Sequence, residues 1–158
     1  KIESNAITFT YTWVHLPELI NDLYKIMKLQ SPSYIEIQKD EIPDLFLYTD
    51  RSRLRQILSN LLSNAIKHTS KGSITFGYRL IDKDTIRFHV TGTGISQEQQ
   101  NAIFIRFVQA VESQKKGVGL GLALCKGFVE HMDGKIGVIS KEGEGSTFWF
   151  TLPYKAQE

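Results

Sequence analysis

Two segments of alternating apolar and polar residues limit the folds open to this sequence more than any other feature does. Apolar side chains occupy every second position of residues 74–80 and of residues 86–90, and the polar run Asp82-Lys83-Asp84 separates the two segments. This pattern predicts an antiparallel hairpin whose strands share one apolar face. Because such a face needs a second layer to cover it, we expect a layered fold.

The rest of the sequence supplies further strands and three main helices. We expect strands over 7–13, 34–39, 45–48, 135–140 and 147–152, main helices over 17–29, 50–69 and 120–132, and a short helix over 97–103. Pro17 fits the first turn of its helix, and Asp50 can cap the next one. Residues 107–119 show no periodicity and predict a long loop. The expected fold is an α/β two-layer sandwich (α+β), in which a mixed, mostly antiparallel sheet is covered by three main helices.

The composition fits one domain and excludes several classes of protein. The 158 residues are 41% hydrophobic, which suits a full-sized core and argues against intrinsic disorder. No apolar run reaches the roughly 18–20 residues of a membrane helix, so we expect a soluble domain. The net charge of +2 gives no sign of a nucleic-acid partner, and the lone Cys125 excludes an internal disulfide. Since the sequence begins without Met or a signal peptide, we expect a fragment of a longer protein.

The expected helix over 50–69 carries a polar ridge opposite its apolar stripe. Gln56, Asn60, Asn64 and Lys67 are three or four residues apart, so their side chains share one face. Amide oxygens are neutral ligands for Mg²⁺, and an ammonium one turn further along neutralises phosphate oxygens. The ridge therefore suits phosphate chemistry, although a polar stripe is also the ordinary solvent face of an amphipathic helix.

Two glycine clusters favour the phosphate interpretation. Gly92 and Gly94 follow an expected strand, and residues 117–122 (GVGLGL) open an expected helix. Glycines let backbone N–H groups approach an anion, and a helix N-terminus adds the positive end of a dipole. The first cluster also fits an ordinary turn. The second is not the dinucleotide fingerprint, because a loop precedes its Gly-x-Gly-x-Gly, and it is not a Walker motif, because no Gly-Lys-Ser/Thr follows.

Four short motifs resemble those of sensor histidine kinases and occur in the same order. Residues 60–69 (NLLSNAIKHT) resemble the N box, 104–107 (FIRF) the F box, 117–122 (GVGLGL) the second glycine box, and 145–148 (GSTF) the closing strand motif. The opening residues KIES also resemble the end of the dimerisation helix that precedes the catalytic domain in this family. The resemblance implies the Bergerat ATP-binding fold, which agrees with the expected sandwich.

The resemblance also implies a function. It indicates the ATP-binding catalytic domain of a sensor histidine kinase, which uses ATP and Mg²⁺ and transfers the γ-phosphate to a histidine on an adjacent dimerisation domain. The implied partners are that domain, a second copy in a full-length homodimer and a response regulator, with no nucleic acid and no membrane contact. The implied location is a cytoplasmic domain of a membrane-anchored sensor. The chain would comprise the end of the dimerisation helix (1–6), the catalytic domain (7–154) and a tail (155–158).

Individual residues take roles from the same resemblance. Asn64 would ligate Mg²⁺, Asn60 would lie close to the metal and the γ-phosphate, and Lys67 would contact phosphates; these three are the expected catalytic residues. His68 would lie against the nucleotide, and Thr147 near the adenine. The other expected nucleotide-binding residues belong to the glycine clusters, the F box and the lid that follows it: Gly92, Gly94, Ile95, Phe104, Arg106, Phe107, Gly117, Gly119, Leu120 and Gly121.

The first glycine cluster departs from the family pattern. Residues 90–96 (VTGTGIS) are two residues shorter than the usual run, and no acidic residue occurs from Phe88 to Gln97. The family carries an Asp here that accepts a hydrogen bond from the adenine amino group. Losing such a bond costs about 1.5–3 kcal/mol, or roughly ten- to a hundredfold in affinity. The alternative function is therefore a nucleotide-impaired interaction module of the same fold.

Two further expectations concern enzymes of other types and the phosphoacceptor. Gyrase- or HSP90-type ATPases activate water with a Glu where this chain has Asn60, and Asn cannot act as a general base, so that type is disfavoured. None of His15, His68, His89 and His131 falls on a preceding dimerisation helix. We therefore expect the phosphoacceptor histidine outside this sequence.

Overall fold

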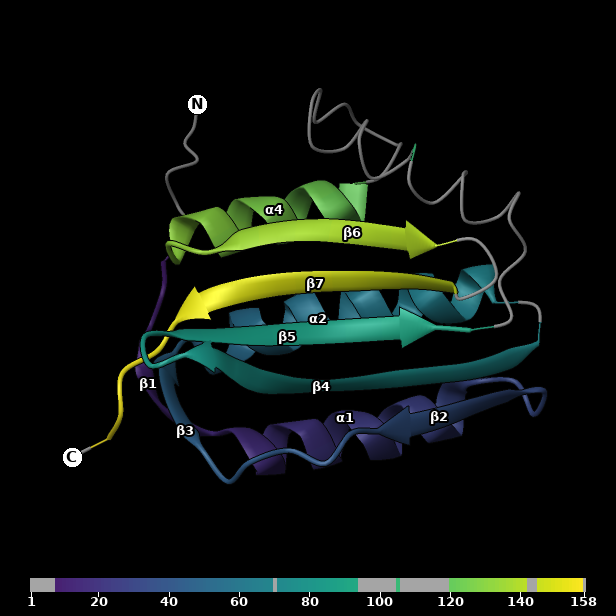
Figure 1. Cartoon of the computed structure of the whole chain (residues 1–158), viewed down its shortest axis with the longest axis horizontal. Helices are drawn as coiled ribbons and strands as arrows, with labels where there is room; N and C mark the ends of the chain where they lie inside the picture. Colours follow the sequence, from purple (N-terminus) through teal and green to yellow (C-terminus); the bar gives the residue numbers. More distant parts are fainter. Residues whose placement is uncertain (1–7, 70, 94–104, 106–119, 142–144, 158) are drawn as a thin grey trace.

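The computed structural model of the chain describes residues 8–69, 71–93, 105, 120–141 and 145–157 (Figure 1). The predicted helix end over 1–6, the short helix over 97–103 and the loop over 107–119 lie outside these residues. The described elements are, in chain order, β1 (Thr12–His15), α1 (Leu16–Gln30), β2 (Ile35–Lys39), β3 (Phe46–Thr49), α2 (Arg51–His68), β4 (Gly72–Asp82), β5 (Thr85–Gly92), α4 (Leu120–His131), β6 (Lys135–Lys141) and β7 (Gly145–Pro153).

Five strands form the main sheet, in the order β2-β4-β5-β7-β6. β2 and β4 are parallel, and the other neighbouring pairs are antiparallel. The predicted hairpin is β4–β5, and at its turn the Asp82 carboxylate accepts a hydrogen bond from the Asp84 N–H at 2.8 Å. The mixed, mostly antiparallel sheet is thus confirmed.

The helices α1, α2 and α4 cover one face of this sheet (Figure 1). Alternate strand residues such as Phe76, Phe88 and Phe150 are fully buried on that face, and Leu58 and Leu61 of α2 are fully buried as well. The period-two pattern of the strands and the 3-4 pattern of the helices therefore meet in one core. This arrangement confirms the two-layer sandwich. No helix among the described residues is long and apolar enough to cross a bilayer.

Asp50 begins α2 as predicted. Its carboxylate accepts a hydrogen bond from the Arg53 N–H at 3.0 Å and a second from the Thr10 N–H at 2.8 Å. The first bond satisfies a helix donor that has no partner within the helix, and the second attaches the N-terminal segment to α2. At the other end, the Thr69 hydroxyl donates to the Ala65 carbonyl at 2.7 Å. Side-chain hydrogen bonds therefore stabilise both ends of α2, the helix that carries the polar ridge.

The first strand differs from its predicted position. It was expected over 7–13, whereas β1 spans Thr12–His15 and pairs with β3 in a separate two-stranded sheet. The residues before β1 make side-chain and capping contacts instead: the Phe9 ring stacks on His131 with centroids 4.0 Å apart. Alternation alone did not indicate that this segment binds to helix ends rather than to a strand.

Candidate functional site

The second half of α2 and the N-terminus of α4 meet at one end of the sandwich. The helices are antiparallel, because Cys125 of α4 contacts Asn60 of α2, while Met132, just past α4, contacts Thr49, just before α2. β5 ends and β7 begins at the same end (Figure 1). Described parts of the N box, the second glycine box and the closing strand motif are therefore neighbours in space.

The polar ridge of α2 forms as predicted. Asn60 and Asn64 are half-buried, and Lys67 is exposed one turn further along. Their spacing places two amide groups and one ammonium on one face of α2 at this end of the molecule. No group of three His, Cys, Asp or Glu side chains within the described part of the chain forms a metal site. Two neutral amide oxygens beside an ammonium suit an Mg²⁺ ion that is itself bound to phosphates, with the oxygens facing the metal and the ammonium facing the phosphates.

A buried thiol holds the Asn60 amide. The Nδ2 group of Asn60 donates to Cys125 Sγ at 3.6 Å, and the thiol donates to the Ile57 carbonyl at 3.8 Å. Cys125 is fully buried, and this burial raises the pKa of its thiol from 9.0 to about 11 against the opposing effect of the Asn60 hydrogen bond. The thiol therefore stays protonated at neutral pH. This geometry indicates a structural rather than a reactive Cys125.

The end of β5 and the start of β7 approach each other closely at the site. Gly145 has a φ of +92°, and a Cβ at this residue would lie 2.0 Å from the Gly92 carbonyl oxygen. Gly92 itself is buried and faces Ser146 in the strand register. Glycine is thus required at position 145 for both its backbone conformation and its lack of a side chain.

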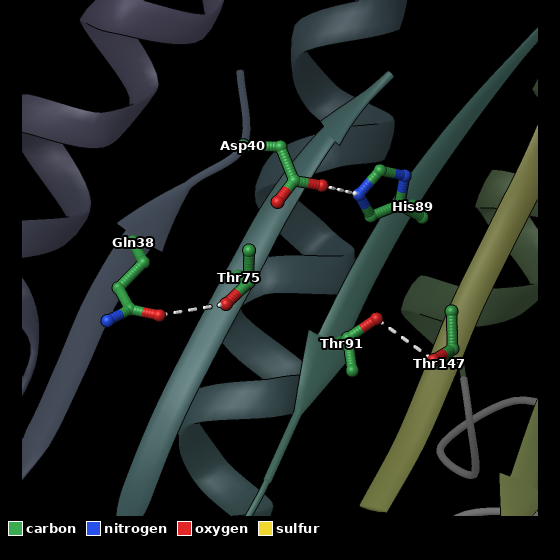
Figure 2. Close-up of polar contacts among 6 residues, drawn as sticks. All are labelled: Gln38, Asp40, Thr75, His89, Thr91 and Thr147. Atoms are coloured by element: carbon green, nitrogen blue, oxygen red, sulfur yellow. Dashed lines mark hydrogen bonds and ion pairs between the residues drawn. The ribbon is translucent and has the colours of Figure 1, made fainter. Parts of the chain in front are cut away.

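Thr147 lies on the face of the sheet turned away from α2. Figure 2 shows its side chain with that of Thr91, the two hydroxyl oxygens being 2.9 Å apart. His89, next to the buried Phe88 in β5, bonds to Asp40 on the same face. The role of Thr147 near the adenine stays a prediction, and its position indicates that a neighbouring residue also has to be considered.

That neighbour is Ser146, which the sequence reasoning missed. Ser146 is buried, and it has the same parity along β7 as the buried core residues Phe148 and Phe150. It therefore lies on the helix-covered side of the sheet, opposite Gly92 and on the same side as the α2 ridge. The period-two alternation of β7 could have identified Ser146 from the sequence alone.

The remaining predicted residues are described in part or not at all. His68, Leu120 and Gly121 are described only as helix positions, at the C-terminus of α2 and the N-terminus of α4. The others lie outside the described residues: Gly94, Ile95, Phe104, Arg106, Phe107, Gly117 and Gly119.

Gly92 ends β5 in the part of the chain where the family pattern has an Asp and this sequence has no acidic residue. It follows Val90 by two residues, so it lies on the helix-covered side of β5, where Val90 is fully buried. The next residue, Thr93, pairs with Ser73: its N–H donates to the Ser73 carbonyl at 2.8 Å. β5 therefore ends in a regular ladder, and none of the residues at this covered end of the strand carries a carboxylate.

Two cavities lined by described residues lie away from the ridge. One of about 240 Å³ is lined by residues that include Tyr11, Tyr48 and Met132, and one of about 680 Å³ by residues that include Arg87 and Trp149. These residues lie at the opposite end and on the uncovered face of the sheet. The site is therefore identified by its donor chemistry and by the meeting of the motifs rather than by a cavity.

Comparison with known proteins places this geometry in a family. A family model described as "Histidine kinase-, DNA gyrase B-, and HSP90-like ATPase" matches residues 49–156. The sensor protein GacS of Pseudomonas syringae pv. syringae is 38% identical over 172 residues, which cover 100% of this chain and 19% of GacS. The sensor protein EvgS of Escherichia coli O157:H7 is 34% identical over 97% of this chain and 14% of its own length.

Solved structures of histidine kinases have the same fold as this chain. Full-length ShkA in complex with AMPPNP superimposes with a TM-score of 0.78 at 32% identity, over 96% of this chain and 33% of ShkA. The nucleotide-free catalytic domain of histidine kinase ThkA superimposes with a TM-score of 0.71 at 28% identity, over 92% of this chain and 96% of that domain. The chain therefore belongs to the histidine kinase-, DNA gyrase B- and HSP90-like ATPase family, and within it to the catalytic, ATP-binding domains of sensor histidine kinases.

The chain is much shorter than its curated relatives. It spans 14% of EvgS, 19% of GacS and 36% of the adaptive-response sensory kinase SasA of Synechococcus elongatus. This chain thus corresponds to a minor part of each of those proteins.

Proposed function

We propose that this chain binds Mg-ATP at the end of the sandwich where α2 and α4 meet, and that it positions the γ-phosphate for transfer to a histidine on an adjoining dimerisation domain. The observation that carries the proposal is the α2 ridge, where half-buried Asn60 and Asn64 and exposed Lys67 lie beside the N-terminus of α4. This combination of amide oxygens, an ammonium and a helix N-terminus suits a metal-bound polyphosphate.

Each residue of the ridge has a separate role in the proposal. Asn64 supplies an amide oxygen to Mg²⁺, Asn60 orients water or phosphate oxygens beside the metal, and Lys67 neutralises charge on the phosphates. When bound, Mg²⁺ neutralises the negative charge that the phosphate oxygens carry during the transfer. The remaining contribution of the protein is positioning, because phosphoryl transfer needs little covalent chemistry from side chains.

The proposal extends to the whole protein of which this chain is a part. Residues 7–154 form the catalytic domain, residues 1–6 end a dimerisation helix, and residues 155–158 form a tail. In the full-length protein, a homodimer anchored to the membrane places this domain in the cytoplasm, and a response regulator receives the phosphoryl group. The kinship with GacS and EvgS, both named sensor proteins, supports this assignment.

Calorimetric titration of this chain with ATP, with and without Mg²⁺, tests the proposal. We expect saturable binding that is tighter with the metal. A folded sample without saturable binding at millimolar Mg-ATP would overturn it. Gln56→Ala is the matched control for variants of Asn60 and Asn64, because Gln56 is an exposed carboxamide on the same ridge but further from the site.

One observation favours a second function, an interaction module with impaired nucleotide binding. The first glycine cluster is two residues shorter than the family pattern, and no acidic residue occurs from Phe88 to Gln97. Without the carboxylate of the family pattern, adenine selectivity weakens while the phosphate contacts remain. Competition by GTP distinguishes the two functions: equal, weak binding of ATP and GTP would support the second.

A further inference from the structure

The strongest unassigned feature of the site is the contact between its two helices. Asn60 and Cys125 are 65 positions apart in the chain, and the Asn60 amide donates to the Cys125 sulfur at 3.6 Å. The thiol in turn donates to the Ile57 carbonyl at 3.8 Å. Cys125 thus bridges two groups on α2 that lie three residues apart.

We infer that Cys125 is a positioning residue that fixes the orientation of the Asn60 amide at the site; this inference rests on the proposed function. A carboxamide is planar and has donor hydrogens on one side and the acceptor oxygen on the other. Because Nδ2 is the amide atom that faces the sulfur, Oδ1 of Asn60 is the atom that does not. The oxygen is the atom that a cation, or a water bound to a cation, requires.

The surroundings of the thiol favour one of the two possible orientations of the Asn60 amide. Cys125 is fully buried and stays a protonated thiol, so its hydrogen is directed to the Ile57 carbonyl and its sulfur is left to accept from Asn60. If the Asn60 amide were flipped, Oδ1 could receive a hydrogen from the sulfur only if the thiol gave up its hydrogen bond to the Ile57 carbonyl. The flipped amide is therefore disfavoured in the folded protein.

The contact also couples two motifs. α4 begins at Leu120, within the second glycine cluster, and Cys125 follows Leu120 by five residues. A displacement of α4 along α2 therefore changes the acceptor that holds Asn60. Orientation of a polar group beside a metal by a partner that does not itself touch the metal is a recognised way to tune a metal site.

Three variants test the inference. Cys125→Ala removes the acceptor, Cys125→Ser keeps a hydroxyl acceptor, and Val129→Ala removes buried volume one turn further along α4, away from Asn60. The first readout is the ratio of the ATP dissociation constants without and with Mg²⁺. We expect Cys125→Ala to lower this ratio about tenfold, Cys125→Ser to restore most of it, and Val129→Ala to leave it unchanged.

A second readout does not depend on nucleotide. The side-chain NH₂ signals of Asn60, assigned by their loss in Asn60→Ala, are compared by NMR in the ligand-free wild type, Cys125→Ala and Val129→Ala. We expect them to shift and broaden only in Cys125→Ala. If they are the same in all three proteins, the inference is overturned, whether or not ATP binds. If the wild type shows no saturable ATP binding, the proposed function fails while the NMR comparison still decides the inference.

A double-mutant cycle completes the test. In an Asn60→Ala background, Cys125→Ala should have no further effect on the Mg²⁺ ratio, because the amide that it orients is gone. An equal effect in both backgrounds would show that Cys125 acts only through the packing of α4, and it would overturn the inference.

Discussion

The Gly92 carbonyl oxygen fills the space beside Gly145 in which a side chain would otherwise begin. A Cβ on Gly145 would lie 2.0 Å from that oxygen, and the φ of Gly145 is +92°, a backbone conformation that side chains rarely tolerate. The close approach brings the last residue of β5 against the first of β7 at the end of the sandwich that carries the α2 ridge. The GSTF motif thus begins with a glycine for a steric reason.

Gly145→Ala should therefore destabilise the protein. We expect a loss of at least about 1–3 kcal/mol in the free energy of unfolding, from backbone strain together with displacement of the β5 carbonyl. Gly127→Ala is the control, because a Cβ there would meet nothing within 4 Å and the residue lies within α4. That change should stabilise by about 0.5–1 kcal/mol. Urea denaturation measures both, and equal effects of the two substitutions would contradict the steric argument.

Restoring the missing acid should strengthen nucleotide binding. Inserting Thr-Asp between Val90 and Thr91 keeps the alternation of β5, because two added residues leave every later side chain on the same face. We expect ATP affinity to rise roughly ten- to a hundredfold, as a carboxylate accepts from the adenine amino group. Inserting Thr-Ala is the matched control for the longer loop. If both insertions bind ATP equally, the carboxylate does not limit affinity in this chain.

Much of the scaffold could be predicted because its signals are local. Asp50 caps α2 where predicted, and the β4–β5 hairpin forms from its alternating segments. The β1–β3 pair could not be predicted, because pairing between strands 30 residues apart in sequence depends on how the intervening α1 and β2 fold back on the molecule. The same limit applies to the contact between Asn60 and Cys125, since helical periodicity shows which face each residue occupies but not which helices will meet.

Helical spacing predicts the α2 part of the site, whereas the β7 part requires the strand alternation as well. The ridge of Asn60, Asn64 and Lys67 follows from helical spacing, and it forms on one face of α2. The closing motif alone indicates Thr147, but it does not show which face of the sheet each residue of the motif occupies. The strand alternation of the neighbouring residues shows that face. Phe148 and Phe150 are buried, so odd and even positions of β7 face opposite sides, and Ser146 is the residue on the covered side. Applying that parity to the motif would have selected Ser146 as well.

Asn64→Ala should weaken the binding of Mg-ATP far more than that of ATP without metal. The substitution removes a neutral oxygen ligand from a half-buried position while leaving Lys67 to contact the phosphates. We expect a loss of about ten- to a hundredfold in the presence of Mg²⁺ and little change in EDTA. Titration calorimetry measures both, with Gln56→Ala as the carboxamide control. Equal losses with and without metal would contradict the ligand role.

Stability at alkaline pH should depend on the buried thiol. Burial raises the pKa of Cys125 from 9.0 to about 11, so above pH 9 the unfolded chain loses this proton while the folded protein keeps it. The thiol's contribution to folding is therefore complete below pH 9 and is lost as the pH rises through about 11. Over that interval its effect on the free energy of unfolding approaches roughly 1.4 kcal/mol per pH unit.

Comparison with Cys125→Ala isolates this effect. The pKa of Tyr78 is also raised by burial, but Tyr78 is present in both proteins, so its contribution cancels in the difference between them. Urea denaturation at several pH values from 8 to 11 should show wild-type stability falling more steeply than that of the variant above about pH 9. Parallel pH profiles would mean that the thiol ionises equally well in the folded protein. In that case the sulfur is more accessible to solvent than its position between α2 and α4 implies, and the hydrogen bond from Asn60 is correspondingly weaker.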